Sequence, residues 1–171
     1  MDVVFREWMV ETAERYCSAA ELLSREKNLS RQAQINAALS IEILLKSYLA
    51  VTDLHEGEVF ETYEAKLGHD LIELADKIPS EIRRYLEIGD SIEGAPTTRT
   101  RRYIDTYRNT FYEDRYIYET LRDRTRHNEV KKRTVYSPEF IKVARRLIDK
   151  TILLYIDMGS DDLWINSQKP E

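Results

Sequence analysis

Cysteine, glycine and proline are scarce in this chain of 171 residues. The single cysteine, Cys17, excludes an internal disulfide and favours a reducing, cytoplasmic location. Five glycines and four prolines are too few for an all-β protein with many tight turns. No apolar run reaches the roughly 18 residues of a membrane span. The N-terminal segment MDVVFREWMVETAERY carries charges throughout, unlike a signal peptide, so we expect no membrane association.

The motifs of several common site types are missing as well. Neither GxGxxG nor GxxxxGK[ST] occurs, which leaves no recognised phosphate-binding loop. CxxC, HExxH and EF-hand spacings are absent, and so are serine-nucleophile signatures. His55 and His69 lie in one region, but no third ligand stands near them. We therefore expect neither a metal nor a cofactor.

Helical periodicity is the main pattern that is present. Apolar residues recur every three or four positions in segments separated by Gly, Pro or Ser, and residues 53–67 and 91–98 are predicted as connections without strands. The fold class is therefore predicted as all-α, an antiparallel bundle of four to six helices in one domain of residues 1–158, followed by a polar tail at 159–171. The expected helices are 3–24, 30–50, 69–78, 80–86, 98–119 and 138–158.

Individual residues predict how these helices begin, end and pack. Ser30 is expected to be an N-cap, and Ser137-Pro138 to open the last helix. Gly159 is expected to end that helix. The predicted core stripe of the first helix is Phe5, Trp8, Thr12, Tyr16, Ala19 and Leu23, and that of the last helix is Phe140, Ile141, Ala144, Leu147, Ile148, Ile152 and Tyr155.

Positive charge is concentrated in one part of an otherwise acidic protein. The whole chain carries a net charge of −5, yet residues 99–133 hold 11 basic and 6 acidic residues. An overall negative charge argues against a protein that coats nucleic acid generally. Two interpretations of the basic part stay open: a helix pair with solvated arginines, or a local anion site.

Three segments together resemble the HEPN domain, a small helical family named for nucleotide binding in higher eukaryotes and prokaryotes. The segment QAQINAALSIEILLKSYLA carries Glu42, and Lys46 four residues later, within an apolar helix. The segment GHDLIELADKI opens on His69 and Asp70. The segment RDRTRH, before the last helix, matches the family's Arg-x4-6-His motif.

The resemblance implies a helical bundle that often forms a symmetric homodimer, with two Arg/His motifs meeting in a basic cleft. The implied activity is metal-independent endoribonuclease cleavage that leaves 2′,3′-cyclic phosphate ends, of the toxin–antitoxin or defence type. The implied catalytic residues are Arg122 and His127, with the polar residue Asp123 beside them. Arg124 and Arg126 are expected to contact RNA, and an antitoxin or another partner protein is an expected binding partner.

A second alignment within the same family stays open. The segment TYRNTFYEDRYIYE resembles an Arg-Asn and Arg-Tyr pattern, which would make Arg108, Asn109, Arg115 and Tyr116 the nucleic-acid-binding residues. No histidine completes that pattern, so this alignment implies a catalytically inactive module that binds a nucleotide or a partner protein and serves assembly. A third interpretation is a plain helical interaction domain that presents an apolar patch to a partner.

Overall fold

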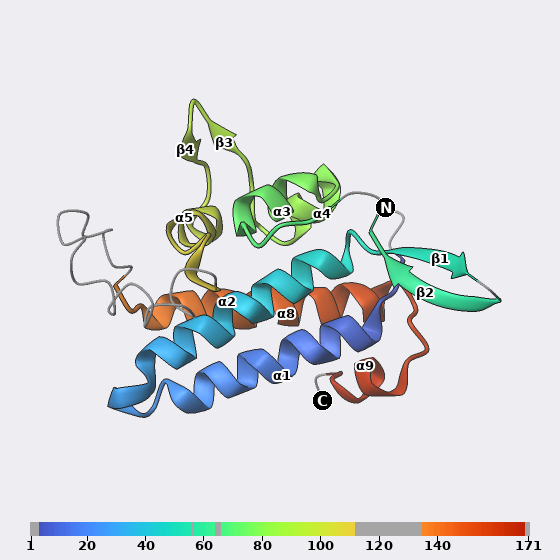
Figure 1. Ribbon diagram of the computed structural model, residues 1–171, viewed down its shortest axis with the longest axis horizontal. Coiled ribbons are helices and arrows are strands. Elements are labelled where there is room, and N and C mark those ends of the chain that lie inside the picture. The colour runs from blue at the N-terminus through green and yellow to red at the C-terminus, as the bar shows by residue number, and fades with distance from the viewer. Residues whose placement is uncertain (1–3, 56, 64–65, 112–134, 170–171) are drawn as a thin grey trace.

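Three long helices form the body of the protein (Figure 1). Helix α1 (Glu7–Leu23) and helix α2 (Ser30–Ser47) run antiparallel and are joined by the 3₁₀ turn η1 (Lys27–Leu29). Helix α8 (Pro138–Asp157) lies beside both and runs in the direction of α2. The computed structural model describes residues 4–55, 57–63, 66–111 and 135–169.

Four shorter helices pack around this body. Helix α3 (Leu71–Lys77) lies against α2 and is followed directly by α4 (Ser80–Tyr85). Helix α5 (Arg99–Thr106) contacts both α3 and α8. Helix α9 (Leu163–Ser167) packs against α1 and α8 at the opposite side of the molecule (Figure 1). The described part of the chain is therefore mainly α-helical.

Two small antiparallel hairpins interrupt the helices. Strands β1 (Val51–His55) and β2 (Glu58–Thr62) extend from the end of α2, and Val51 pairs with Thr62. Strands β3 (Ser91–Ile92) and β4 (Ala95–Pro96) form a shorter hairpin before α5. Figure 1 shows that both hairpins project away from the helical body.

The prediction of strand-free connections at 53–67 and 91–98 is therefore wrong. Much of the described side-chain surface of these hairpins is exposed, including Val59 and Phe60. A strand alternates apolar and polar residues only when one of its faces is buried, and these strands have no such constraint. The pattern that would have identified them in the sequence is consequently absent.

The predicted core stripe of the first helix is only partly correct: Phe5 and Leu23 pack against the core, but Trp8 does not. Trp8, which belongs to that stripe, is 56% exposed. Ala13 and Cys17, which do not belong to it, are fully buried. The hydroxyl of Ser40 on α2 donates a hydrogen bond to the backbone oxygen of Ala13 at 2.8 Å, which shows how closely the two helices approach. Small residues permit such an approach and aromatic ones do not. The buried residues of α1 are Met9, Val10, Ala13, Cys17 and Ala20.

The last long helix agrees with its prediction. All seven residues of the predicted α8 stripe are buried. Pro138 is the first helical residue. Gly159 follows the helix with a φ of +83°, and the backbone N–H of Ser160 donates to the oxygen of Tyr155 at 2.9 Å. Beyond this turn, α9 places Ile165 in the common core.

Two predicted boundaries differ from the structure. Ser30 is not an N-cap, because its own φ and ψ are helical and α2 continues directly from η1. The long helix predicted at 98–119 is interrupted: α5 ends at Thr106, residues 107–109 form a turn, and residues 110–111 are helical again. The remainder of that predicted helix, 112–119, lies outside the described residues.

Candidate functional site

Most of the residues expected at a functional site lie in one undescribed segment. Residues 112–134 are outside the described part of the chain. Arg108 and Asn109 are described, and they follow α5 directly. The expected site residues that lie outside the described part are Arg115, Tyr116, Arg122, Asp123, Arg124, Arg126 and His127.

Arg108 is held by two carboxylates. Its Nε donates to Asp70 Oδ2 at 2.7 Å, its Nη2 lies 2.7 Å from the same oxygen, and its Nη1 lies 3.4 Å from Asp105 Oδ1. The hydrogen bond to Asp70 raises the pKa of Arg108 above its usual value. The backbone oxygen of Arg108 also accepts from the N–H of Leu71 at 3.2 Å. Arg108 therefore joins α5 to α3, while Asn109 beside it is exposed.

Asp70 explains why α3 begins where it does. It is the N-cap, and its Oδ1 accepts from the N–H groups of Ile72 at 2.9 Å and Glu73 at 3.1 Å. Its other oxygen receives Arg108. Both oxygens of this carboxylate are thus engaged, and the start of α3 is fixed against the end of α5.

Glu42 is a buried carboxylate on the apolar helix α2. The residue is 3% exposed, and its Oε1 lies 2.7 Å from Lys46 Nζ and 2.9 Å from His69 Nδ1. The pair with Lys46 joins residues four positions apart on one face of the helix. Within the described residues, Oε2 of Glu42 is buried and has no hydrogen-bond partner. A buried carboxylate oxygen without a hydrogen-bond partner costs free energy of folding.

His69 connects this carboxylate to the surface. Its side chain is 52% exposed, although Nδ1 is bound to the buried Glu42. The imidazole ring packs against Phe111, with ring centres 5.5 Å apart and an interplanar angle of 37°. His69 precedes the N-cap Asp70 directly, so the well-defined start of α3 also fixes the backbone position of His69.

These residues form one polar cluster, which we define as Glu42, Lys46, His69, Asp70 and Arg108. Glu42 lies against Lys46 and His69, Asp70 lies against Arg108, and Asp105 adds a third carboxylate beside Arg108. Chemically, the cluster offers one imidazole nitrogen, Nε2, that Glu42 does not occupy.

The sequence placed His69 beside Asp70 at the opening of a segment, but it did not indicate the bond to Glu42. A signal was nevertheless present. A carboxylate within an apolar helix needs several donors, and Lys46 alone cannot supply hydrogen bonds to both oxygens.

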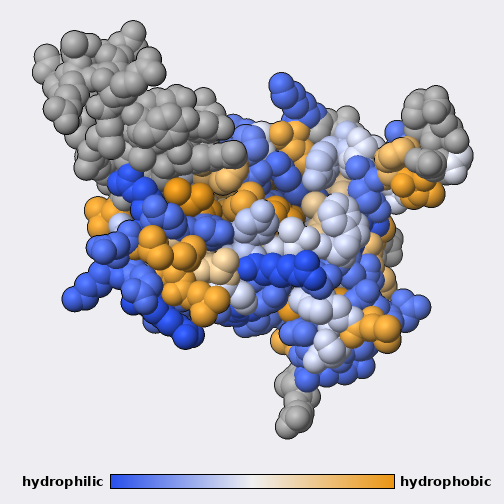
Figure 2. Space-filling model, turned by 60° about the horizontal axis from the view of Figure 1, so that its bottom comes forward, coloured by the Kyte–Doolittle hydropathy of each residue, from blue (hydrophilic) through white to orange (hydrophobic). Residues whose placement is uncertain are grey.

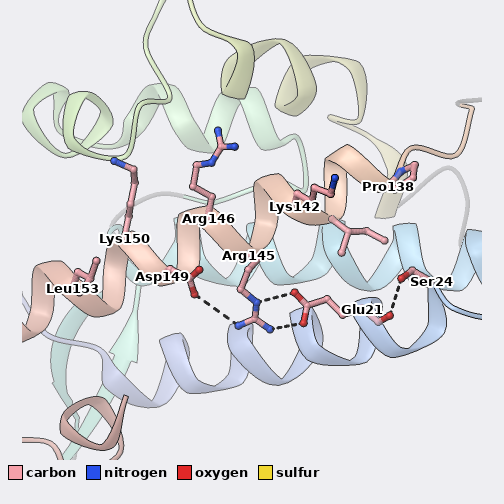
Figure 3. Close-up of a pocket in the computed structure, with 10 residues that line it drawn as sticks. Glu21, Ser24, Pro138, Lys142, Arg145, Arg146, Asp149, Lys150 and Leu153 are labelled. Atoms are coloured by element: carbon pink, nitrogen blue, oxygen red, sulfur yellow. Dashed lines mark hydrogen bonds and ion pairs between the residues drawn. The ribbon is translucent and has the colours of Figure 1, made fainter. Parts of the chain in front are cut away.

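A separate pocket of about 480 Å³ lies between α1 and α8 (Figure 3). Arg145 points from α8 toward α1, where its Nε and Nη2 donate to the two oxygens of Glu21 at 2.8 and 2.9 Å. Hydrogen bonding to Glu21 raises the pKa of Arg145 further above its usual range. Arg146 and Lys150 point away from this ion pair in Figure 3. Since its central cation is already neutralised, the pocket is a helix–helix contact rather than an anion site.

Exposed apolar side chains do not single out a docking surface. Figure 2 shows apolar residues in separate patches among hydrophilic ones on the face that it displays. Scattered exposed apolar residues are normal in proteins. Among the described residues, the large apolar side chains that are exposed come from many different elements: Val4, Trp8, Leu22, Val59, Phe60, Ile92, Val135, Leu153 and Leu163.

The described residues contain neither a cluster of metal ligands nor a helix that could cross a bilayer. No group of three or more His, Cys, Asp or Glu side chains lies close enough together there to hold a metal ion. No described helix is both long enough and apolar enough to cross a bilayer.

Comparison with known proteins was made at three levels. No protein-family model matches the chain. No curated protein matches it. No solved structure matches it.

Proposed function

We propose that this protein is a HEPN-like, metal-independent endoribonuclease that acts as a homodimer through Arg122 and His127. One observation carries the choice between the two alignments of the family motif: Arg108 is bound to Asp70 and Asp105. A guanidinium that is already neutralised by two carboxylates is a poor phosphate ligand. This supports RDRTRH as the functional motif in preference to the alignment through Arg108.

The helical framework also supports the proposal. The two other segments that resemble the family lie in α2 and α3, and they are in direct contact through Glu42 and His69. Segments separated by 27 positions thus meet in space, as parts of a single site would. The long helix α8 follows RDRTRH in the chain, as the family resemblance implies.

The proposed chemistry follows from the residue types. The ribose 2′-OH attacks the adjacent phosphorus, the P–O5′ bond breaks, and a 2′,3′-cyclic phosphate and a free 5′-OH remain. An unperturbed imidazole changes its charge near neutral pH, so in this proposal His127 transfers protons during these steps. Arg122 holds the phosphate oxygens, on which negative charge builds up. Two-fold symmetry brings a second Arg/His motif to the cleft.

The test is RNA cleavage in excess EDTA by the wild type and by His127→Ala and Arg122→Ala. We expect the wild type to leave cyclic-phosphate ends and His127→Ala to be slower by about 100-fold or more, since general acid–base catalysis contributes about that much. Arg102→Ala is the matched control, because Arg102 is an exposed arginine on α5 within the same basic region.

Equal cleavage by the wild type and His127→Ala would reject the motif as the active site. If none of the proteins cuts RNA, the catalytically inactive module takes the place of the nuclease. Binding of a nucleotide or a partner protein is then the property to measure.

A further inference from the structure

We propose that the Glu139 cluster, which we define as Arg99, Glu139, Lys142 and Arg146, binds the phosphates of single-stranded RNA where α5 meets the start of α8. The inference rests on the proposed function, because it takes RNA as the ligand from there. It does not depend on the Arg/His motif. Every residue of the cluster is described, and RNA binding is measurable without cleavage.

One carboxylate holds the three cations of the cluster together. Arg99 Nη2 lies 3.2 Å from Glu139 Oε2, and Lys142 Nζ lies 2.7 Å from Glu139 Oε1. Hydrogen bonding to Lys142 lowers the pKa of Glu139, and the charges of Lys142 and of the two arginines lower it further. Arg146 is therefore close to the same carboxylate. Arg99 and Glu139 are 40 positions apart, so the fold and not the local sequence assembles this cluster.

Positive charge exceeds negative charge in the Glu139 cluster. Three cations and one carboxylate leave a local charge of +2, on a chain whose net charge is −5. Lys142 and Arg146 are four residues apart on α8, and like charges at that spacing destabilise a helix. Exposed ion pairs contribute little to stability, so folding alone does not account for this arrangement. A bound anion would neutralise the excess charge.

The cations of the cluster are accessible to a ligand. The side chains of Arg99 and Lys142 are 67% and 68% exposed, and Arg146 is exposed as well. Figure 3 shows that Arg146 points away from the side of α8 on which Arg145 binds Glu21. The cluster is thus distinct from that neutralised ion pair.

A row of stacked rings orients Arg99. Its guanidinium carbon lies 5.8 Å from the ring centre of Tyr103. Tyr103 stacks on Tyr107 with ring centres 6.4 Å apart, and Tyr107 stacks on Phe140 at 4.4 Å. Phe140 is fully buried, so the row begins in the core. A guanidinium held in this way loses less freedom when it binds a ligand.

Phosphate is the anion that suits these side chains. A guanidinium donates two parallel hydrogen bonds to phosphate oxygens, and a lysine adds a point charge. One RNA strand carries successive phosphates, so a single ligand can neutralise more than one cation. Glu139 is the competing anion of the cluster, and its charge should weaken RNA binding.

The test is binding of a 2′-O-methyl RNA of about 12 nucleotides, a length within the usual range of single-strand sites. This ligand lacks the 2′-OH nucleophile and is not cleaved. We expect Arg99→Ala, Lys142→Ala and Arg146→Ala each to raise the Kd by about fivefold, the upper end for one exposed ion pair. The slope of log Kd against log salt concentration should fall by about 0.7 for each lost phosphate contact.

Two further variants separate this role from a structural one. We expect Glu139→Gln to lower the Kd by about twofold or more, because it removes the competing charge. A variant that merely unfolds would bind RNA less well. Arg102→Ala is the matched control, since Arg102 is an exposed arginine on α5 outside the cluster, and it should bind as the wild type does. Circular dichroism checks that the helical content is equal.

The outcomes distinguish the inference from the proposed function. No RNA binding by the wild type, an unchanged Kd in the three alanine variants, or an equal loss in Arg102→Ala overturns the inference. Displacement of the RNA by oligoglutamate of equal charge also overturns it, because the cluster then suits an acidic protein segment. RNA cleavage with unchanged binding in the cluster variants would leave only the proposed function. Binding through the cluster without cleavage would reject the nuclease and keep the RNA-binding surface.

Discussion

At the scale of single residues, Asp70 has the best-defined role in the described structure. One oxygen caps α3 and the other binds Arg108, so one side chain fixes the beginning of a helix and its neighbour α5. The two roles are separable by substitution. An asparagine side chain keeps an oxygen for the cap but loses the charge, whereas alanine loses both.

We therefore expect Asp70→Ala to lower the free energy of unfolding by about 1–2 kcal/mol, with roughly 1 kcal/mol of that from the cap. Asp70→Asn should lower the free energy of unfolding by less than Asp70→Ala does. Urea unfolding followed by circular dichroism measures both, and Glu73→Gln, which changes an exposed neighbour, is the control. If Asp70→Asn and Asp70→Ala are equally destabilised, the cap contributes nothing.

At the scale of elements, the end of α8 depends on backbone geometry. Gly159 has a φ of +83°, and no atom lies within 4 Å of the position where a Cβ would be added. Any cost of a side chain there is therefore conformational and not steric. Gly68 offers a comparison, because its φ is not in the left-handed region and its nearest neighbour is 4.0 Å away.

We expect Gly159→Ala to lower the free energy of unfolding by about 1 kcal/mol, the usual cost of a left-handed backbone for an L-residue. Gly68→Ala should be neutral or slightly stabilising, because alanine reduces the freedom of the unfolded chain. Both are measured by urea denaturation under the same conditions. The same change in both variants would show that the turn after α8 does not require glycine.

At the scale of the whole molecule, a buried thiol and a buried phenol make the free energy of unfolding depend on pH in the alkaline range. Burial raises the pKa of the Cys17 thiol from 9.0 to about 12 and that of the Tyr155 phenol from 10.0 to about 12. In the unfolded chain these groups ionise at their lower values. The folded chain thus keeps protons that the unfolded chain loses, and stability falls as pH rises through this interval.

We expect the free energy of unfolding to fall between about pH 9 and 12, by at most about 1.4 kcal/mol per pH unit for each group. Cys17→Ala should reduce the slope over that whole range. Tyr155→Phe should reduce it only above about pH 10. Denaturant unfolding at a series of pH values measures the slopes, and unchanged slopes in both variants would refute the assignment.

Much of the helical framework was predictable from local patterns. The stripe of α8, its opening Pro138 and its end at Gly159 are each encoded by a few neighbouring residues, and the structure confirms them. The helix that opens on HDL and the i,i+4 pair of Glu42 and Lys46 are local in the same sense. Helical periodicity and capping act within one or two turns, so sequence alone is enough for them.

The candidate site was predictable only in part. The composition of α2 and of the HDL segment drew attention to Glu42 and His69, but not to their contact. Arg108 was expected among the nucleic-acid-binding residues, and in the structure it binds Asp70, which is 38 positions away. Pairings between distant segments depend on how the helices pack, and no local pattern specifies them.

The sequence by itself determined a mainly helical protein, the positions of most helices and the residues that resemble a family motif. Tertiary structure decided which α1 face is buried, where the exposed hairpins form and which charges meet. Buried Arg101 is one example, since its guanidinium binds Asp76 and Ser91 of separate elements. The physical reason is the same in each case: burial and desolvation are properties of the packed chain, whereas periodicity and capping belong to the local sequence.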